Sequence, residues 1–558
     1  MLLILHSTLV MWLGWRMTPT QDEIAHLPAG LAIWRLGRTD LYSVNPPLVR
    51  GLAASPLLLM PHDEDWTPLT HNQLGPRREW AVGAAFIQAN GRRSWWLFTL
   101  ARWVCLPWTL LGGWIVWQWS RDVWSDAIAL VPLALWCCSP NIIGYAALIT
   151  PDIPAITALL LAAWQYRHWL DQPRWGRAVC AGLALGLAWL TKSQWLILLP
   201  IWLLLWLRQC WHSSDSSPRP AATQILFLLL IGWSVLCLGF GGRGVGQPLG
   251  ELKFYSQQLS GDALTSGNRL QGTLPGNCPN PVPRDFLLGI DLQMRDFELG
   301  RPCYLLGTWR EQGVWWFYLF GLAVKVPVGI WLLTACGLWS VLRSPDERRR
   351  VESFLPLLLP AIAVFVVASW QTSLHVYVRY VFCVLPVMYL FSASAWHWAM
   401  ERKGRGLQVG LAALTLLAVG EGLAQSPHAL SFFNIASGGP TRGARLLHDA
   451  NVDWGQNLRE VEEWLERYPA RRPVTLAWPG LYPVAWVGLP IPTTPVNQLT
   501  PGWHLISSFN LHAAHGGYRL YRDLSPVGTV GANVFIYHVP PVSDATGGKS
   551  SSPSTHAD

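Results

Sequence analysis

Residues 222–241, ATQILFLLLIGWSVLCLGFG, contain no charged side chain and only a few polar ones. A helix rises about 1.5 Å per residue, so about 20 residues cross the roughly 30 Å apolar core of a bilayer. This stretch therefore predicts a membrane-spanning helix. Comparable runs recur along the chain, and we expect about eleven spans, near 2–18, 95–119, 124–143, 153–169, 178–191, 193–208, 222–241, 313–341, 354–370, 377–399 and 407–425.

One pair of these runs has two interpretations. Residues 178–191 and 193–208 are separate spans if the polar segment 191–194 (TKSQ) forms a turn between them. They are one long tilted helix if the helix continues through that segment. We favour two spans, because the polar residues stand where a turn fits.

The composition is that of a membrane protein. Of 558 residues, 51% are hydrophobic and only 13% are charged, about half the charged share of a globular protein. The chain has 36 Trp, a residue that favours the boundary between lipid headgroups and hydrocarbon. Its net charge of +8 does not gather into one basic patch with interleaved aromatic residues, so we exclude nucleic-acid binding.

The basic residues instead predict an orientation. Many Lys and Arg residues occupy short gaps between apolar runs, as they do in cytoplasmic loops; these gaps lie near 167–177, 208–219, 343–350 and 402–405. With the N-terminus in the cytoplasm, all four gaps lie inside, and an odd number of spans puts the C-terminus outside the cell membrane. The first span lacks a charged n-region and a small-residue cleavage site, so we expect an uncleaved anchor.

This pattern predicts an α-helical polytopic membrane protein with a small α/β domain outside the cytoplasm. The transmembrane domain covers residues 1–425 and has outer loops at 19–94 and 242–312. The α/β domain covers residues 426–540, and residues 541–558, rich in Ser, Gly and Thr, are typical of a disordered tail.

Within the α/β domain, residues 456–467 (QNLREVEEWLER) have apolar positions at helical spacing. The apolar runs near 473–478, 503–508 and 533–539 are typical of strands.

Two cysteines fall in the predicted outer segments. Of ten Cys, only Cys278 and Cys303 lie there. An oxidising compartment favours a disulfide between them. Two free buried thiols fit the sequence equally well.

The first outer loop opens with two adjacent acids, Asp22 and Glu23. Partial burial of a carboxylate raises its pKa and makes it a better base. The alternative is that both acids stabilise the start of a helix through its dipole.

The apolar stretches 28–37 and 48–61 are too short to span the membrane and suit helices that lie on its surface. Because Pro28 removes a backbone donor, we expect the first of these helices to begin there.

Several motifs carry a family resemblance. TQDEIAHLPAGLAIWRLGRTDLYSVNPPLVRGLAASPLLL (20–59) resembles the first outer loop of the GT-C superfamily of membrane glycosyltransferases, and most closely the protein O-mannosyltransferase group (glycosyltransferase family 39) with its bacterial aminoarabinose-transferase relatives. Further segments resemble motifs of that group in the same order: SPNIIGYAALITPDIP (139–154), GLAWLTKSQWLILLP (186–200), CYLLGTWREQGVWWFYLFGLAVKVPVG (303–329), LHVYVRYVFCVLP (374–386) and LSFFNIASGGPTRGARLLHDANVDWGQNL (430–458).

The resemblance implies an enzyme and a set of site residues. It implies transfer of a sugar, mannose or a related one, from a polyprenyl-phosphate carrier to a hydroxyl group on a protein, lipid or glycan. The implied catalytic residues are Asp22 as the base, together with Glu23 and Asp152. The residues expected to bind substrate are His26, Arg102, Lys192, Arg379 and Tyr380.

Each of these residues also has a structural interpretation. Asp152 is well placed to cap a helix, and Arg102 and Lys192 can extend to the lipid headgroups. A lone His, such as His26, is more often structural than functional.

Some features depart from the family or leave its activity open. Relatives often carry an acid, His or Lys just before Pro-Pro-Leu, where this chain has Val44-Asn45. That departure leaves open the interpretation that the protein is an assembly subunit that has the fold without the activity.

A transporter or flippase of a lipid-linked or anionic substrate is the alternative from another functional class. The His residues are scattered and no CxxC occurs, so no metal-ligand spacing appears. The resemblance implies transfer without a metal ion or other cofactor, although some GT-C relatives use a divalent ion.

Overall fold

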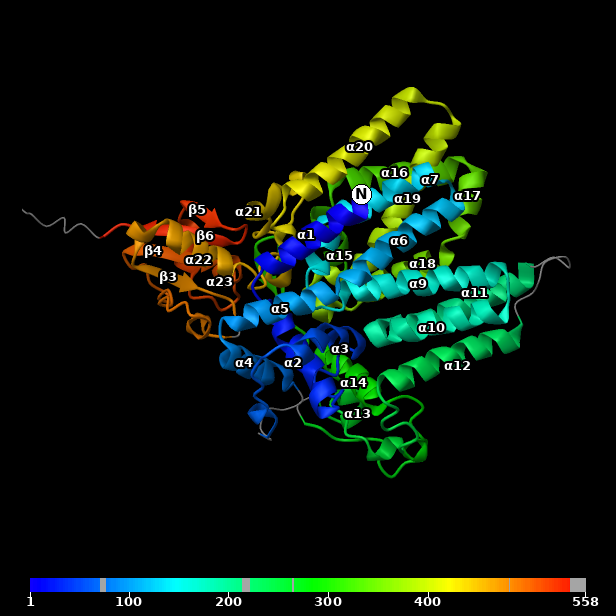
Figure 1. Ribbon diagram of the computed structural model, residues 1–558, viewed down its shortest axis with the longest axis horizontal. Coiled ribbons are helices and arrows are strands. Elements are labelled where there is room, and N and C mark those ends of the chain that lie inside the picture. The colour runs from blue at the N-terminus through cyan, green and yellow to red at the C-terminus, as the bar shows by residue number, and fades with distance from the viewer. Residues whose placement is uncertain (71–76, 213–220, 263–264, 481, 542–558) are drawn as a thin grey trace, which may run out of the picture.

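The computed structural model describes residues 1–70, 77–212, 221–262, 265–480 and 482–541, and the predicted tail from 542 onward lies outside these residues. The described chain is mostly helical, with one small sheet toward the C-terminus (Figure 1). The predicted fold class is confirmed to that extent.

The helices of the main body are α1 (Leu2–Arg16), α5 (Arg93–Val104), α6 (Leu106–Val123), α7 (Asp126–Cys138), α8 (Pro140–Ala146), α9 (Asp152–Asp171), α10 (Trp175–Thr191), α11 (Leu198–His212), α12 (Ala222–Gly239), α15 (Phe317–Lys325), α16 (Val328–Arg343), α17 (Pro345–Glu352), α18 (Leu355–Trp370), α19 (Leu385–Glu401) and α20 (Arg405–Ala424).

Each predicted span falls on one of these helices or on a consecutive pair. By length and composition alone, three of the helical stretches among the described residues can cross a membrane: Ala222–Gly239, Val378–Glu401 and Arg405–Ala424. Three bent pairs raise that number to six if each pair is one span. The eleven spans and their orientation stay predictions.

The predicted span 313–341 is wrong as a single helix. The structure divides it into α15 and α16, whose axes differ by 113°. Pro327 causes the break, because it lacks an N–H donor and forces the preceding Val326 into an extended conformation. The predicted interruption after Thr191 is confirmed, since α10 ends there and a 3-10 turn, η4 (Ser193–Ile197), leads into α11.

Glycines let two of the apolar helices approach closely. In Figure 1, α10 lies between α9 and α12, and the packing of α10 against both is extensive. A Cβ atom on Gly182 would lie 2.6 Å from the carbonyl oxygen of Leu228 in α12, and Gly186 faces Val235 in the same way. Small residues at helix contacts are characteristic of packing inside membranes. The contact fixes the end of α10, and hence the position of Lys192 just beyond it.

The two predicted outer loops contain short helices and a hairpin. The first loop forms α2 (Gln21–Leu36), α3 (Leu48–Ala54), η1 (Ser55–Leu59), η2 (Thr67–Thr70) and α4 (Glu79–Asn90). The second forms α13 (Gln257–Ser260), α14 (Arg284–Leu299), and strands β1 (Cys303–Leu305) and β2 (Thr308–Arg310). Contrary to expectation, α2 begins at Gln21 and contains Pro28 in its interior.

The early start of α2 has a local cause. Thr20 caps the helix, and the Glu23 carboxylate accepts hydrogen bonds from the Thr20 N–H at 3.0 Å and its hydroxyl at 2.8 Å. This capping arrangement supplies partners that the first turn of a helix otherwise lacks. It places Asp22 in the first turn of α2.

The C-terminal unit is a four-stranded sheet with α22 (Leu458–Arg467). Its strands are β3 (Val474–Ala477), β4 (Gly502–Ser507), β5 (Gly528–Val530) and β6 (Val534–Val539), in the order β3-β4-β6-β5, with β3 parallel to β4 and the other pairs antiparallel. The predicted helix and three of the strands are confirmed. The short strand β5 was not predicted, because its three residues give too little pattern.

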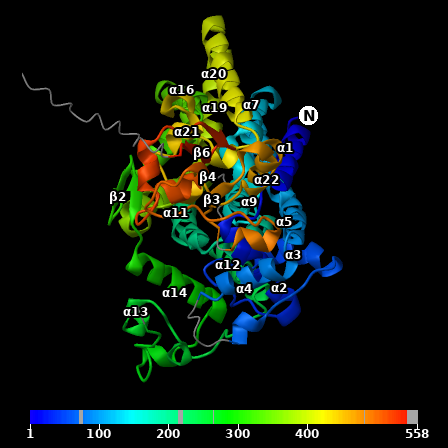
Figure 2. The same cartoon turned by 90° about the vertical axis from the view of Figure 1, so that its left-hand side faces the viewer.

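The sheet unit is docked on the first outer loop. One apolar core joins Leu458 and Val461 of α22 and Leu505 of β4 to Ile24 of α2 and Phe98 of α5. Figure 2 looks at the molecule from the sheet end and shows α22 close to α5. The sheet unit therefore braces the loop that carries Asp22.

The hypothetical disulfide is absent. Cys278 is exposed, Cys303 is buried, and both are free thiols. Both thiols are free, as in the second alternative, but only Cys303 is buried.

Candidate active site

Four charged side chains that are distant in sequence meet at one place, and we call them the charged cluster: Asp22, Asp152, Lys192 and Arg379. The Arg379 Nη2 atom lies 2.9 Å from Asp22 Oδ2, and Arg379 Nε lies 3.4 Å from Asp152 Oδ2. Lys192 Nζ lies 3.3 Å from Asp152 Oδ1. The cluster thus alternates in sign along a chain of ion pairs.

Each member of the cluster stands at the end of a helical element. Asp22 is in the first turn of α2, and Asp152 is the first residue of α9, where the helix dipole favours a negative charge. Lys192 follows the last residue of α10. Arg379 lies in η8 (Val378–Val384), the 3-10 turn that leads into α19.

The cluster is mostly shielded from solvent, with one more open member. The side chains of Asp152 and Arg379 are 4% and 5% exposed, whereas Asp22 is 21% exposed. Burial raises the pKa of Asp22, and the Arg379 guanidinium opposes that rise. Asp22 therefore has the accessibility and the raised pKa that a general base requires.

Aromatic rings frame the Arg379 guanidinium. Its central carbon lies 4.2 Å from the ring centre of Tyr377 and 4.1 Å from that of Trp454. The Tyr380 ring is 5.8 Å from Arg379 and 5.3 Å from Lys192 Nζ. Such cation–π contacts hold the cation without neutralising it. Arg379 Nη1 is buried and has no hydrogen-bond partner among the described residues, so it is available to an anionic ligand.

Glu23 and Arg102 form a separate buried pair. Arg102 donates through Nε and Nη2 to Glu23 at 2.8 and 2.6 Å, and its other hydrogen bonds go to the backbone carbonyls of Gly14, Met17 and Thr18. A guanidinium has five N–H donors, and these bonds use them all. This geometry favours a structural role for Arg102 and Glu23 rather than the predicted roles in substrate binding and catalysis.

His26 lies on the same helix as Asp22 but does not join the charged cluster. Its ring is 4.6 Å from that of Tyr42, and its Nδ1 atom is buried without a partner among the described residues. Burial and the positive charges of Arg50 and Arg379 lower its pKa well below the usual value, which favours the neutral imidazole. Its predicted contact with substrate stays a prediction.

The segment 449–456 (DANVDWGQ), quoted above without an assigned role, holds the site together. The Trp454 and Gln456 carbonyls accept hydrogen bonds from Gln21 and Thr18 at 3.1 and 2.9 Å, which fixes the entry to α2. Asn451 accepts from the Val378 N–H at 3.0 Å and donates to the Val376 carbonyl at 2.7 Å, which fixes the entry to Arg379. One segment therefore positions both partners of the Asp22–Arg379 ion pair.

A cavity of about 170 Å³ adjoins the cluster, and its lining includes Arg301, Tyr304, His448 and Asp449. The Tyr377 hydroxyl donates to Asp449 at 3.4 Å and accepts from Arg301 Nη1 at 3.4 Å. Since the Tyr377 ring also contacts Arg379, this cavity lies one residue away from the charged cluster.

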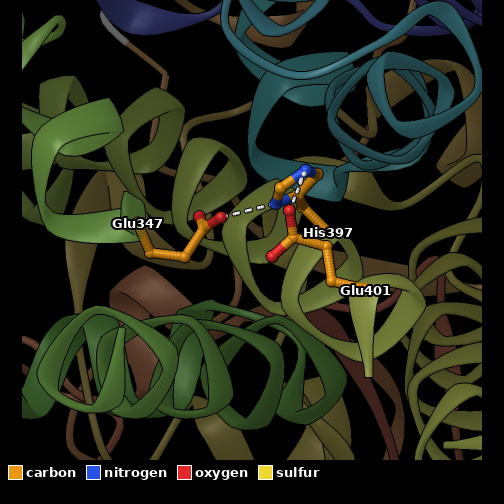
Figure 3. A group of neighbouring side chains, drawn as sticks. All are labelled: Glu347, His397 and Glu401. Atoms are coloured by element: carbon orange, nitrogen blue, oxygen red, sulfur yellow. Dashed lines mark hydrogen bonds and ion pairs between the residues drawn. The ribbon is translucent and has the colours of Figure 1, made fainter. Parts of the chain in front are cut away.

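A group with metal-ligand chemistry lies elsewhere (Figure 3). His397 stands between Glu347 and Glu401, with its nitrogens 2.5 and 3.4 Å from their carboxylates. Glu347 also accepts from Trp124 Nε1 at 3.1 Å and Ser394 Oγ at 2.6 Å, so it ties α17 to neighbouring helices. The group is at the C-terminal end of α19, about 25 Å along the helix from Arg379, and plays no part in the charged cluster.

Comparison with known proteins finds a family model that is similar to part of the chain. Residues 92–235 match the family model described as dolichyl-phosphate-mannose-protein mannosyltransferase. No curated protein matches the sequence. Solved structures that resemble the chain include ArnT from Cupriavidus metallidurans bound to undecaprenyl phosphate, with 12% identity over 96% of this chain and 97% of that one, at a TM-score of 0.45.

The oligosaccharyltransferase of Archaeoglobus fulgidus is also similar. Its complex with zinc and sulfate has 14% identity over 76% of this chain and 53% of that one, at a TM-score of 0.42. Because these scores lie below 0.5, the likenesses do not define the site. The family match contains Arg102, Asp152 and Lys192. Over residues 92–235 the chain is thus similar to the family described as dolichyl-phosphate-mannose-protein mannosyltransferase, and the resemblance predicted from its motifs is confirmed.

Proposed function

We propose that this protein is an integral membrane glycosyltransferase that moves a sugar from a polyprenyl-phosphate carrier to a hydroxyl group on an acceptor outside the cytoplasm. The observation that carries the proposal is the charged cluster, where a partly accessible carboxylate lies beside a buried guanidinium with a free donor. The family name, which describes a lipid-phosphate sugar donor, supports the same donor class.

In the proposed reaction Asp22 is the general base. It accepts the proton of the acceptor hydroxyl, whose oxygen forms a bond to the anomeric carbon of the sugar. The bond from that carbon to the carrier phosphate breaks, and the phosphate leaves with the electron pair. A positioned base of this kind contributes roughly 10²–10⁴-fold to a rate.

The cations of the cluster stabilise the leaving phosphate. Arg379 keeps one donor free, and Lys192 is 17% exposed at the edge of the cluster. Fixed positive charge at the developing phosphate needs no reorganisation during the reaction, which is the usual source of electrostatic catalysis. Asp152, which lies between the two cations, keeps them close together despite their mutual repulsion.

The assignment of Asp22 rather than Glu23 as the base follows from their surroundings. Glu23 is fully buried and accepts hydrogen bonds from Arg102, Thr20 and the Ile149 N–H. Those bonds occupy both of its oxygens and block access to it. Asp22 has one cation partner and more exposure. Mannose as the sugar remains part of the proposal, as do protein, lipid and glycan as acceptor classes.

The test is transfer of label by the purified protein in lipid nanodiscs. Undecaprenyl-phosphate sugars with radiolabelled mannose, glucose or aminoarabinose are incubated with cell-envelope extract, and the labelled product is identified. We expect label in a product other than the carrier, no transfer by Asp22→Asn, and normal transfer by Asp63→Asn. Asp63 is the matched control, because it is an exposed acid of the same loop and pairs with Arg93 away from the cluster. Movement of intact labelled lipid across a bilayer without sugar transfer would instead identify a flippase.

A further inference from the structure

A second, larger cavity lies between the β1–β2 hairpin, the segment after α21 (Gly439–Gly443), and the sheet unit. Its volume is about 500 Å³. Three arginines, Arg442, Arg445 and Arg522, share its lining with the aromatic rings of Tyr304, Phe535 and Tyr537, and we call it the basic cavity. Two of these arginines come from the GGPTRGAR stretch (438–445) of the motif quoted above.

The charge of the basic cavity is uncompensated. No Asp or Glu belongs to the described residues that line it, and none of its three arginines forms an ion pair within the described part of the chain. The guanidinium of Arg522 is held in place by the carbonyls of Leu511 and Ala513, at 2.6 and 3.3 Å. These carbonyls orient the group and do not neutralise it.

The arginines act on the same buried groups. Burial raises the pKa of Tyr304, and the positive charges of Arg522 and Arg445 oppose that rise. Burial, with Arg522, His448 and Arg445, lowers the pKa of His512 to about 3. The neutral His512 ring contacts the Tyr304 hydroxyl at 3.2 Å and closes one wall. The described lining of the cavity is therefore net positive, and the acid that acts on Arg522, Asp523, lies outside this lining.

The basic cavity adjoins the route to the charged cluster. Tyr304 lines both this cavity and the smaller one that contains Asp449 and Arg301. Asp449 accepts a hydrogen bond from Tyr377, whose ring lies 4.2 Å from Arg379. Tyr304, Asp449 and Tyr377 therefore link the basic cavity to the charged cluster through a chain of neighbouring residues.

We propose that the basic cavity binds a phosphate or carboxylate group carried on a sugar of the acceptor. Guanidinium groups match the paired oxygens of phosphate and carboxylate in geometry and charge. The aromatic rings offer flat apolar faces for a sugar ring, as is usual in binding pockets that combine apolar walls with a few polar anchors. The assignment to the acceptor rests on the proposed function, in which the donor phosphate occupies the charged cluster.

The test uses glucose 6-phosphate as the probe and glucose as its uncharged counterpart, with binding to the full-length protein in nanodiscs measured by calorimetry. We expect saturable binding of glucose 6-phosphate and none of glucose. The affinity for glucose 6-phosphate should fall by about tenfold or more in the R442Q/R445Q double variant, because each charge-assisted hydrogen bond contributes a factor on the order of ten to the affinity. Both arginines are exposed, so the substitutions leave the core unchanged. Arg467→Gln, an exposed arginine at the end of α22, is the control and should bind normally.

A lipid with a phosphorylated headgroup shows whether the bound anionic group belongs to a lipid acceptor or to a soluble one. Vesicles with phosphatidylinositol 4-phosphate are compared with vesicles of phosphatidylinositol. Tighter binding of the lipid probe than of glucose 6-phosphate identifies a lipid acceptor, and tighter binding of the soluble probe identifies a soluble one. The proposal is overturned if the protein binds neither glucose 6-phosphate more tightly than glucose nor phosphatidylinositol 4-phosphate more tightly than phosphatidylinositol. It is also overturned if R442Q/R445Q binds the phosphorylated probes as tightly as the wild type does.

Donor binding separates this proposal from the proposed function. Undecaprenyl phosphate binding should be unchanged in R442Q/R445Q and weakened in Arg379→Gln. If undecaprenyl phosphate does not bind at all, the proposed donor is wrong, while the anion preference of the basic cavity is still measured on its own. If undecaprenyl phosphate binds and the sugar phosphate does not, only the inference about the basic cavity fails.

Discussion

The Asp22 carboxylate and the Arg379 guanidinium are 2.9 Å apart although they lie 357 positions apart in the chain. Both are held by the same third segment, through the carbonyl of Trp454 and the side chain of Asn451. A base and a cation held this close are suited to a reaction in which a proton is removed while negative charge develops on a leaving group.

Removal of the cation should weaken donor binding. Arg379→Gln eliminates a charge-assisted hydrogen bond to the carrier phosphate, of about 1.5–3 kcal/mol, and we expect the Kd for undecaprenyl phosphate to rise roughly 10–100-fold. Titration of the lipid into protein in nanodiscs provides the measurement. Arg93→Gln, an exposed arginine outside the cluster, should bind as the wild type does. An unchanged Kd in Arg379→Gln would show that this residue does not contact the donor.

The same pair predicts a pH dependence. Burial raises the pKa of Asp22 and Arg379 opposes the rise, and the base acts only when deprotonated. Transfer should therefore increase with pH through the raised pKa. In Arg379→Gln the opposing charge is lost, the pKa of Asp22 rises further, and the acidic limb of the kcat/KM profile should move to higher pH. An acidic limb at the same pH in both proteins would assign that limb to another group.

Arg102 should matter for stability instead of donor binding. Arg102→Gln leaves the fully buried Glu23 carboxylate without its cation, and loss of one partner of a buried pair costs about 3–5 kcal/mol. We expect a lower midpoint in thermal unfolding and a smaller yield of folded protein. An Arg102→Gln variant with normal thermal stability and no donor binding would instead support the substrate-binding role predicted from the sequence.

Trp454 should act as a positioning residue. Trp454→Ala removes one of the two closest rings around the Arg379 guanidinium, and a cation–π contact is worth about 0.5–2 kcal/mol. We expect the KM for the donor to rise by about 2–30-fold with a smaller change in kcat. Trp454→Phe, which keeps a ring, should recover most of the affinity. Equal KM values in the Ala variant and the wild type would exclude this contact from donor binding.

Sequence motifs predicted all four members of the charged cluster but not how they meet. Asp22, Asp152, Lys192 and Arg379 lie in separate motifs, and only the packing of α2, α9, α10 and η8 shows that they form one chain of ion pairs. Local spacing carries no information about contacts between residues more than 350 positions apart.

The differences from expectation have local physical causes. The partners of Arg102, which are Glu23 and the carbonyls at the end of α1, are not identifiable from its neighbours in sequence, and they favour a structural role over the predicted one. The start of α2 was placed too late, because the capping effect of Thr20 and Glu23 outweighs the missing donor of Pro28. Pro327 was present in the sequence, and its effect on the helix was underestimated.

The most direct test is the single-turnover rate of sugar transfer by Asp22→Asn, measured with undecaprenyl phosphate binding on the same preparation. The amide keeps the size of the side chain and cannot accept the proton, so we predict a rate at least about 10²-fold lower with donor affinity within a few-fold of the wild type. Transfer at the wild-type rate by Asp22→Asn, with Asp63→Asn as the matched control, would contradict the assignment of Asp22 as the base.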